Sequence, residues 1–353
     1  MKAKKPSRET NATLLKQAML RRLPRRIAAR GELLLAAVPS LLDHYQQMLL
    51  SIFASLGRVF NDAEKAHMRT VLETWLNKGW EASPYARILV KYETDPPPKT
   101  TLTYNVAVNV VTIADEYEHW TKTRTPPLFG AHADSKVMDL ALAQGEPSSC
   151  PILDVGAGTG RNTLPLLKAG FPTDAIEIAP ALAAVLRNDA EQAGLNVRVF
   201  EGDATSRELG VPENHYQLIV MAEVVASHFR NVAHLRQLLQ ALCAYLRPGG
   251  LLLFSAFLPL DGYKPDQLAR ELGEVFWCVV FSRSDIEQAA AGLPLERIED
   301  ESTLEYEREH LPKEAWPPTG WFEQWSSGGD LFDLPPQRAP LELRWLTYRK
   351  KLV

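Results

Sequence analysis

Apolar residues recur at three- and four-residue intervals through the N-terminal part of the chain, a spacing that predicts helices with one apolar face. The positions are Leu33–Leu35, Leu41, Leu42, Tyr45, Met48, Leu49, Ile52, Phe53 and Leu56. Asn61 followed by Glu64 is a capping-box pattern, which predicts the start of a helix that runs through Trp75. From this pattern we expect residues 12–92 to be helical.

The hydrophobic period changes after Pro96-Pro97-Pro98, a stiff run that stops any helix. Residues 102–110 alternate apolar and polar side chains and are rich in valine, which predicts a strand. A short helix is expected from Asp115 to Lys122. These breaks divide the chain into a helical N-terminal extension over residues 1–98, a strand and lid-like connecting segment over 99–145, and a core over 146–353.

Beyond Pro151, short apolar runs alternate with amphipathic segments. The predicted strands are 152–155, 174–178, 197–200, 216–221, 251–254, 295–298 and 342–346. The predicted helices are about 162–167, 181–193 and 232–246. Strands that alternate with helices at this spacing predict an α/β fold, a seven-stranded and mostly parallel sheet with helices on both faces.

The segment Asp154-Val155-Gly156-Ala157-Gly158-Thr159-Gly160 joins the first of these strands to the helix after it. Glycines let the backbone pass close to a ligand, and the start of the helix offers unpaired N–H groups. The dinucleotide pattern G-x-G-x-x-G needs a small residue at position 161, where this chain has Arg161. An NAD-dependent oxidoreductase is therefore a disfavoured alternative.

Four further signals follow the glycine loop in order. They are Glu177 at the end of the second strand, Asp203 after the third, Met221 to Phe229 after the fourth, and Arg247-Pro248-Gly249-Gly250 before the fifth. With these signals, the chain resembles the class I, Rossmann-like S-adenosylmethionine-dependent methyltransferases over roughly residues 105–350.

This resemblance implies S-adenosylmethionine as methyl donor, S-adenosylhomocysteine as product, and no metal. It implies that Glu177 binds the ribose hydroxyls and Asp203 the adenine amino group. The implied cofactor contacts are Tyr117, Asp154, Gly156, Ala157, Gly158, Gly160, Asn162, Glu177, Ile178, Asp203, Ala204 and Glu223. Some of these residues have plainer explanations: a strand-end carboxylate is often a helix cap, Asn162 can simply begin a helix, and Tyr117 can pack on the sheet.

Methyl transfer requires an acceptor lone pair aligned behind the methyl carbon, with water kept out. A proton acceptor helps when the nucleophile is a hydroxyl or a protonated amine. The candidates for this role are His228, Glu223 and Glu116, although His228 also fits a structural histidine. The aromatic stretch from Trp316 to Trp325 has two interpretations, a wall of the acceptor pocket or a loop that buries its own rings.

The composition is that of an ordinary globular protein, with 46% hydrophobic and 23% charged residues and a net charge of -4. Residues 1–30 nevertheless hold ten Lys or Arg against one acidic residue, Glu9. This basic arm either attracts an acidic partner or is a solvated tail, disordered over residues 1–11. Three separated cysteines, no apolar run of about 18 residues and no signal-peptide pattern predict a cytoplasmic protein without a membrane partner.

The acceptor is predicted from the extension. A small-molecule methyltransferase of this fold needs little beyond its core and a lid, so residues 1–98 favour a protein acceptor, which the basic arm suggests is acidic. Nucleic acid is not expected, because no aromatic residues are interleaved with the basic ones. The whole-chain plan is also similar to cyanobacterial methyltransferases that modify an asparagine of phycobiliprotein β subunits. A small-molecule methyltransferase and a non-catalytic S-adenosylmethionine-binding module are the alternatives.

Overall fold

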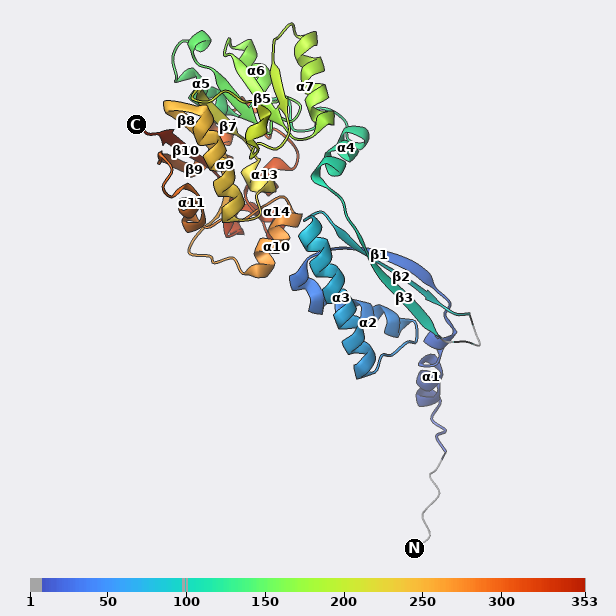
Figure 1. The fold of residues 1–353 in the computed structure, drawn as a ribbon. Coiled ribbons are helices and arrows are strands. Elements are labelled where there is room, and N and C mark those ends of the chain that lie inside the picture. The colour runs from blue at the N-terminus through green and yellow to red at the C-terminus, as the bar shows by residue number, and fades with distance from the viewer. Residues whose placement is uncertain (1–7, 97–98, 100, 353) are drawn as a thin grey trace. The chain divides into compact units, whose positions relative to one another are not determined.

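The computed structural model describes residues 8–96, 99 and 101–352. The chain divides into two compact units, Met1–Thr112 and Ile113–Val353 (Figure 1). The boundary lies after Thr112 and not at the predicted residue 98. The reason is that the strand over 102–109 pairs with the strand before it and so belongs to the first unit.

The first unit is a three-stranded antiparallel sheet with two long helices on it (Figure 1). Its elements are α1 (Ala12–Leu20), β1 (Arg30–Ala36), α2 (Leu42–Ser55), α3 (Asp62–Ala82), β2 (Arg87–Thr94) and β3 (Leu102–Asn109). In the register, Leu33 of β1 lies opposite Val90, and Val90 lies opposite Val106 of β3. The core forms where α2 and α3 place Phe53 and Leu72 against these strands.

The prediction that residues 12–92 are helical is wrong for β1 and β2. The run Leu33–Leu35 lies in β1, where Leu34 is 59% exposed and its neighbours are partly buried. Side chains that alternate between two faces are the property of a strand, and three consecutive leucines conceal that alternation. The capping box is confirmed, since Asn61 and Glu64 each accept from the other's backbone N–H at the start of α3.

The N-terminal helix α1 contains no buried residue, and Asn11 caps it. Leu14 and Met19 are exposed on it, and Arg21 and Arg22 follow directly. The expected disorder of residues 1–11 falls mainly on residues 1–7, which lie outside the described residues.

The second unit contains the predicted seven-stranded sheet, in the order β6-β5-β4-β7-β8-β10-β9. The strands are β4 (Ile152–Val155), β5 (Thr173–Glu177), β6 (Arg198–Glu201), β7 (Tyr216–Met221), β8 (Leu246–Pro259), β9 (Leu295–Ser302) and β10 (Leu341–Lys350). The first five are parallel, whereas β10 is antiparallel to both β8 and β9. The α/β fold with a mostly parallel sheet is thereby confirmed.

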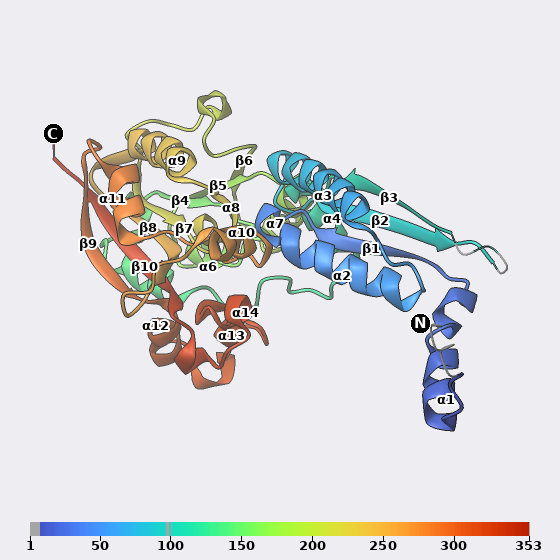
Figure 2. The ribbon, with the colours of Figure 1, turned by 90° about the horizontal axis from the view of Figure 1, so that it is seen from below.

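Helices cover both faces of this sheet (Figure 2). The larger ones are α4 (Ile113–Thr123), α5 (Ser135–Leu142), α6 (Thr163–Lys168), α7 (Pro180–Gln192), α9 (Val232–Tyr245), α10 (Gln267–Val275), α11 (Arg283–Ala290) and α12 (Thr303–His310). Leu153 and Ile219 point to the face that α9 and α11 cover. Ile152 and Leu218, one residue earlier on the same strands, face α5 and α6. This strict alternation explains why the strands are apolar at nearly every position.

Three shorter helices complete the unit: α8 (Val225–His228), α13 (Phe322–Ser326) and α14 (Gly329–Phe332). The turn after β7 lies at the carboxyl end of a parallel strand, the edge at which open α/β sheets bind ligands. Among the described residues, no helix is long and apolar enough to cross a membrane, and no group of acidic, histidine and cysteine side chains has the arrangement of a metal site.

Candidate active site

The glycine loop connects β4 to α6 and is attached to the neighbouring strand. The N–H groups of Gly156 and Ala157 donate to the carbonyl of Ile176 on β5, at 2.8 and 3.1 Å. Gly156 has φ +71°, a conformation that glycine adopts without steric cost. A Cβ atom added there would lie 2.3 Å from Cγ2 of Val224. The backbone therefore passes close to the segment after β7, and only glycine fits.

Glu177 lies at the carboxyl end of β5, beside this loop. Its Oε2 accepts from the N–H of Gly158 at 2.7 Å, and its Oε1 accepts from the N–H of Ala179 at 2.8 Å. Burial raises the pKa of Glu177, while these backbone N–H groups oppose the rise. Each carboxylate oxygen keeps further acceptor capacity, and the binding of a ribose diol by Glu177 stays a prediction.

Three more predicted cofactor contacts lie around Glu177. Ile178 follows it and is 44% exposed, although it directly succeeds a buried strand. Asp203 is exposed after β6, and its Oδ1 accepts from the N–H and the hydroxyl of Thr205, both at 2.8 Å. Ala204 packs against the core. The ligand roles of these three residues stay predictions.

Asp154, at the end of β4, is turned into the protein. Its Oδ2 accepts from the hydroxyl of Thr163 on α6 at 2.6 Å, and burial raises its pKa to about 6. The prediction was a cofactor contact. In the structure this carboxylate instead binds Thr163 at the start of α6. The bond joins the end of β4 to α6 and so fixes the path of the glycine loop between them.

Arg161 and Asn162 begin that helix and both bind Asp134. The guanidinium donates to Oδ1 of Asp134 at 2.5 Å and to Oε1 of Glu223 at 2.8 Å. The Asn162 amide donates to Oδ2 of Asp134 and accepts from its backbone N–H, both at 2.9 Å. Asn162 was predicted to contact the cofactor, yet its amide is committed to Asp134.

Glu223 follows β7 in an unusual backbone conformation, with φ +63°. Its N–H donates to Oγ of Ser255 on β8 at 2.7 Å. Burial raises the pKa of its carboxyl, and Arg161 opposes the rise. Its carboxylate is bonded to Arg161, and both the predicted cofactor role and the predicted catalytic role of Glu223 stay predictions.

His228 ends α8, and its Nε2 lies 2.8 Å from the hydroxyl of Tyr117 on α4. Burial lowers the pKa of His228 to about 4, so the imidazole is neutral at physiological pH. Glu116, the third predicted catalytic residue, accepts from the indole N–H of Trp120 at 3.3 Å. The structure thus brings His228 and Tyr117 together, 111 residues apart in sequence.

Aromatic rings surround this pair. The Tyr117 centroid lies 5.3 Å from Trp120, 6.2 Å from Phe129 and 5.9 Å from Trp277. We call Tyr117, Trp120, Phe129, His228 and Trp277 the aromatic cluster. Phe129 also covers the glycine loop, since a Cβ at Gly158 would lie 3.2 Å from its ring. Trp277 carries no motif and the sequence did not reveal it; the Trp316–Trp325 stretch instead packs partly on itself, as Trp316 does on Phe322.

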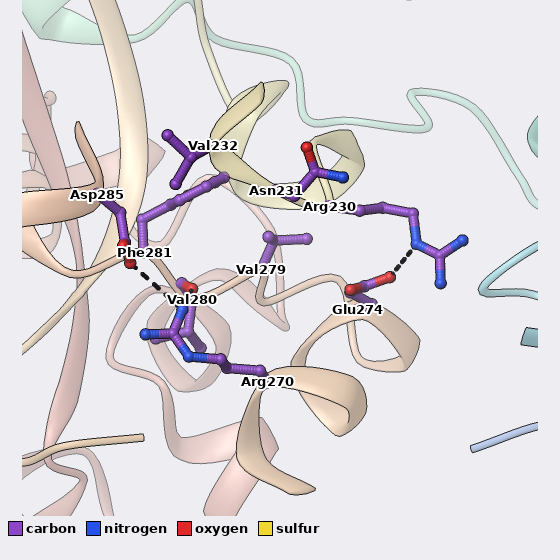
Figure 3. A pocket seen from close by; sticks show the side chains of 9 residues that line it. All are labelled: Arg230, Asn231, Val232, Arg270, Glu274, Val279, Val280, Phe281 and Asp285. Atoms are coloured by element: carbon purple, nitrogen blue, oxygen red, sulfur yellow. Dashed lines mark hydrogen bonds and ion pairs between the residues drawn. The ribbon is translucent and has the colours of Figure 1, made fainter. Parts of the chain in front are cut away.

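A cavity of about 280 Å³ lies between the start of α9 and α10 (Figure 3). Ion pairs close two of its sides, Arg230 with Glu274 and Arg270 with Asp285. Figure 3 shows Val279 between these pairs. Arg230 lies two residues after His228, and Val279 lies two residues after Trp277, so two chain segments lead from the aromatic cluster to the cavity.

Comparisons with known proteins find similarity to methyltransferases. Residues 152–250 match the family model described as a methyltransferase domain. Demethylmenaquinone methyltransferase of Thermus thermophilus is 33% identical over 126 residues, which are 35% of this chain and 53% of that protein. A tRNA N(3)-methylcytidine methyltransferase of Drosophila melanogaster is 34% identical over 38% of this chain and 40% of its own length.

The chain thus spans about half the length of the curated relatives that it matches. Among solved structures, geranyl diphosphate methyltransferase in complex with GPP and sinefungin is 14% identical, with a TM-score of 0.48 over 61% of this chain and 77% of that one. Residues 152–250 of the second unit are thus similar to a methyltransferase domain.

Proposed function

We propose that the protein transfers a methyl group from S-adenosylmethionine to a protein side chain, with the carboxamide of a phycobiliprotein asparagine as the particular acceptor. The observation that carries the protein acceptor is the first unit. It is a compact unit with its own core, formed by α2, α3 and the three-stranded sheet. The methyltransferase fold is complete without it, and a separate unit of this size provides a surface large enough to dock a protein.

The charge distribution supports an acidic protein. Residues 1–30 hold ten Lys or Arg and one acidic residue, and Arg21, Arg22, Arg25 and Arg26 are exposed. Exposed basic residues attract an acidic surface from a distance and raise the rate of encounter.

The residues of the second unit supply the chemistry. S-adenosylmethionine, when bound, supplies a methyl group attached to a sulfonium. The sulfur is the leaving group and becomes a neutral thioether. Glu177 and the glycine loop would hold the ribose end, and the aromatic cluster would keep water away. The acceptor nitrogen would take the methyl group with its lone pair, the sulfonium leaving as the neutral thioether, and would give up one proton. The neutral imidazole of His228, whose Nε2 lies 2.8 Å from the Tyr117 hydroxyl, is the group that we propose to take that proton, directly or through Tyr117.

Small-molecule methylation is the second candidate. It is favoured by the relatives, which include enzymes named for demethylmenaquinone and for malonyl-[acyl-carrier protein], and by the largely aromatic surroundings of His228. A non-catalytic binding module is the third, and the intact glycine loop argues against it.

The test uses S-adenosylmethionine labelled in its methyl group, the full chain, and extract of the source cell separated into protein, nucleic-acid and small-molecule fractions. We expect label in protein, and acid hydrolysis of that protein should release labelled methylamine, because an N-methyl carboxamide yields methylamine. Label that mild base releases as methanol would indicate a carboxyl ester instead. Label confined to small molecules would reject the protein acceptor, and a Gly158→Val variant is the inactive control.

A further inference from the structure

Trp277 has a backbone conformation that large aromatic residues rarely adopt. Its φ is +59°, in the left-handed region where a side chain clashes with its own backbone. It lies two residues after the end of α10 and precedes the cavity-lining residues Val279 and Phe281. Strain of this kind persists only where the surroundings hold the backbone from several sides, and such residues concentrate at functional sites.

The surroundings of Trp277 hold it in this way. Its carbonyl accepts from the indole N–H of Trp325 at 3.0 Å, and Oγ of Ser227 lies 3.5 Å away. The next two N–H groups are also bonded, Cys278 to Gly273 at 2.7 Å and Val279 to Ala226 at 2.6 Å. The segment is thereby pinned to α8, α10 and α13.

The backbone held in this way places the indole of Trp277 beside His228 and Tyr117. The ring centroid of Trp277 lies 5.4 Å from His228, 5.9 Å from Tyr117 and 5.0 Å from Trp120. Trp277 is half-buried, so its ring is not simply core filling. The rings of Trp277 and His228 are nearly perpendicular, with an interplanar angle of 85°.

We propose that Trp277 is the acceptor-facing residue of this site, and that its indole stacks on a planar π-bonded acceptor group, which is a carboxamide under the function proposed above. Stacking orients the plane of the amide, and so fixes the direction of its nitrogen towards the methyl donor. The left-handed backbone conformation of Trp277 sets the orientation of its indole. The inference rests on the proposed methyl transfer.

The experiment uses the full-length protein, labelled S-adenosylmethionine and unfractionated soluble extract of the source cell as acceptor. In Trp277→Ala we expect the extract concentration for half-maximal rate to rise at least about tenfold. The affinity for S-adenosylmethionine, measured by calorimetry, should stay within about twofold. Trp316→Ala removes another half-buried indole and should behave like the native protein.

Two further variants distinguish an indole that positions the acceptor from one that only stabilises the fold. Trp277→Gly accepts the left-handed φ without strain, so it should melt at a higher temperature than Trp277→Ala while losing transfer equally. Trp325→Phe keeps its ring but loses the N–H donor to the Trp277 carbonyl. It should weaken acceptor use with the affinity for S-adenosylmethionine unchanged.

Native acceptor use in Trp277→Ala would overturn the proposal, as would an equal loss of S-adenosylmethionine affinity. If the native protein labels no component of the extract, the proposed methyl transfer fails. If it labels and Trp277→Ala labels equally well, only the role of Trp277 fails.

Discussion

The charged side chains of the candidate site owe their orientation to partners on distant elements. Arg161 binds Asp134 and Glu223, from positions 27 residues before it and 62 after it. The start of α5 is held in turn by Glu307 on α12, which accepts from the N–H groups of Ser135 and Lys136 at 2.6 and 3.2 Å. Burial raises the pKa of Glu307 to about 7. Glu177, by contrast, accepts only from backbone N–H groups of residues close to it in sequence or on the neighbouring loop. Its orientation therefore depends on the strand-and-loop pattern, which the sequence shows.

Replacing Glu177 with Ala should weaken binding of S-adenosylmethionine by roughly ten- to hundredfold, because hydrogen bonds to a charged group contribute about 1.5–3 kcal/mol. Calorimetry on the folded variant measures this directly. Glu201→Ala is the matched control, since Glu201 is an exposed strand-end carboxylate that binds Arg187 instead. Unchanged affinity in Glu177→Ala would remove this residue from the cofactor site.

His228 makes the stability of the protein depend on pH in a defined direction. The unfolded chain protonates this imidazole below about 6.5, whereas the folded state does so only near pH 4. Between these values the unfolded state binds more protons, so the contribution of His228 is fully present above pH 6.5 and is lost as the pH falls towards 4.

Denaturant titrations at pH 4.5 and 7 should therefore show a smaller pH dependence of the unfolding free energy in His228→Phe than in the native protein. The expected difference is about 2–3 kcal/mol, from the cost of 1.36 kcal/mol for each pKa unit. His119→Phe, at an exposed position on α4, should keep the native pH dependence. Identical profiles in His228→Phe and the native protein would contradict a depressed pKa.

At the scale of elements, prediction succeeded where a segment has one clear period and is bounded by turn residues. The parallel strands β4, β5 and β7 are short, apolar and followed by polar or glycine-rich turns, so both the sheet and the position of Glu177 at its edge could be read from the sequence. β1 was missed because three leucines in a row fit either period. β2 was missed although Ile88 and Val90 alternate with less buried residues.

The contacts of α10 and the segment after it could not be predicted, because no local pattern encodes them. Trp277 has a left-handed backbone, and donors from α13 and α8 bind its carbonyl. The pairing of Asp134 with Arg161 also joins segments that carry no shared motif. Tyr117 and His228 were each singled out, but their contact depends on how α4 packs on the sheet unit.

The close approach of α10 to the Trp277 segment gives a test at this scale. A Cβ atom at Gly273 would lie 2.5 Å from the carbonyl oxygen of Cys278, which is backbone and cannot rotate away. Gly273→Ala should therefore destabilise the protein by about 1–3 kcal/mol, measured by denaturant unfolding. Gly320→Ala is the control, because nothing lies within 4 Å of its added Cβ. Equal stability of the two variants would show that α10 has room to shift.

The chain consists of two units, each with its own hydrophobic core. This division changes where a fragment that contains only the second unit should begin. The predicted boundary at residue 98 separates β3 from β2, with which it pairs along its full length. A fragment that begins near Thr100 would carry β3 without its partners, including Val106, which is 4% exposed in the intact unit. An unpaired apolar strand is a site for aggregation.

A fragment of residues 113–353 retains the complete seven-stranded sheet, the glycine loop, Glu177 and the aromatic cluster. Because every one of these groups belongs to the second unit, this fragment should fold and bind S-adenosylmethionine within about threefold of the full chain, as expected when distant parts act independently. It should lose transfer to a protein acceptor, since the proposed docking unit is gone. Calorimetry measures the affinity for S-adenosylmethionine, and labelling of the protein fraction measures transfer. Light scattering should show more self-association in a fragment of residues 100–353 than in residues 113–353. Full protein labelling by residues 113–353 would mean that the methyltransferase domain recognises its acceptor alone, and the role proposed for the first unit would have to be abandoned.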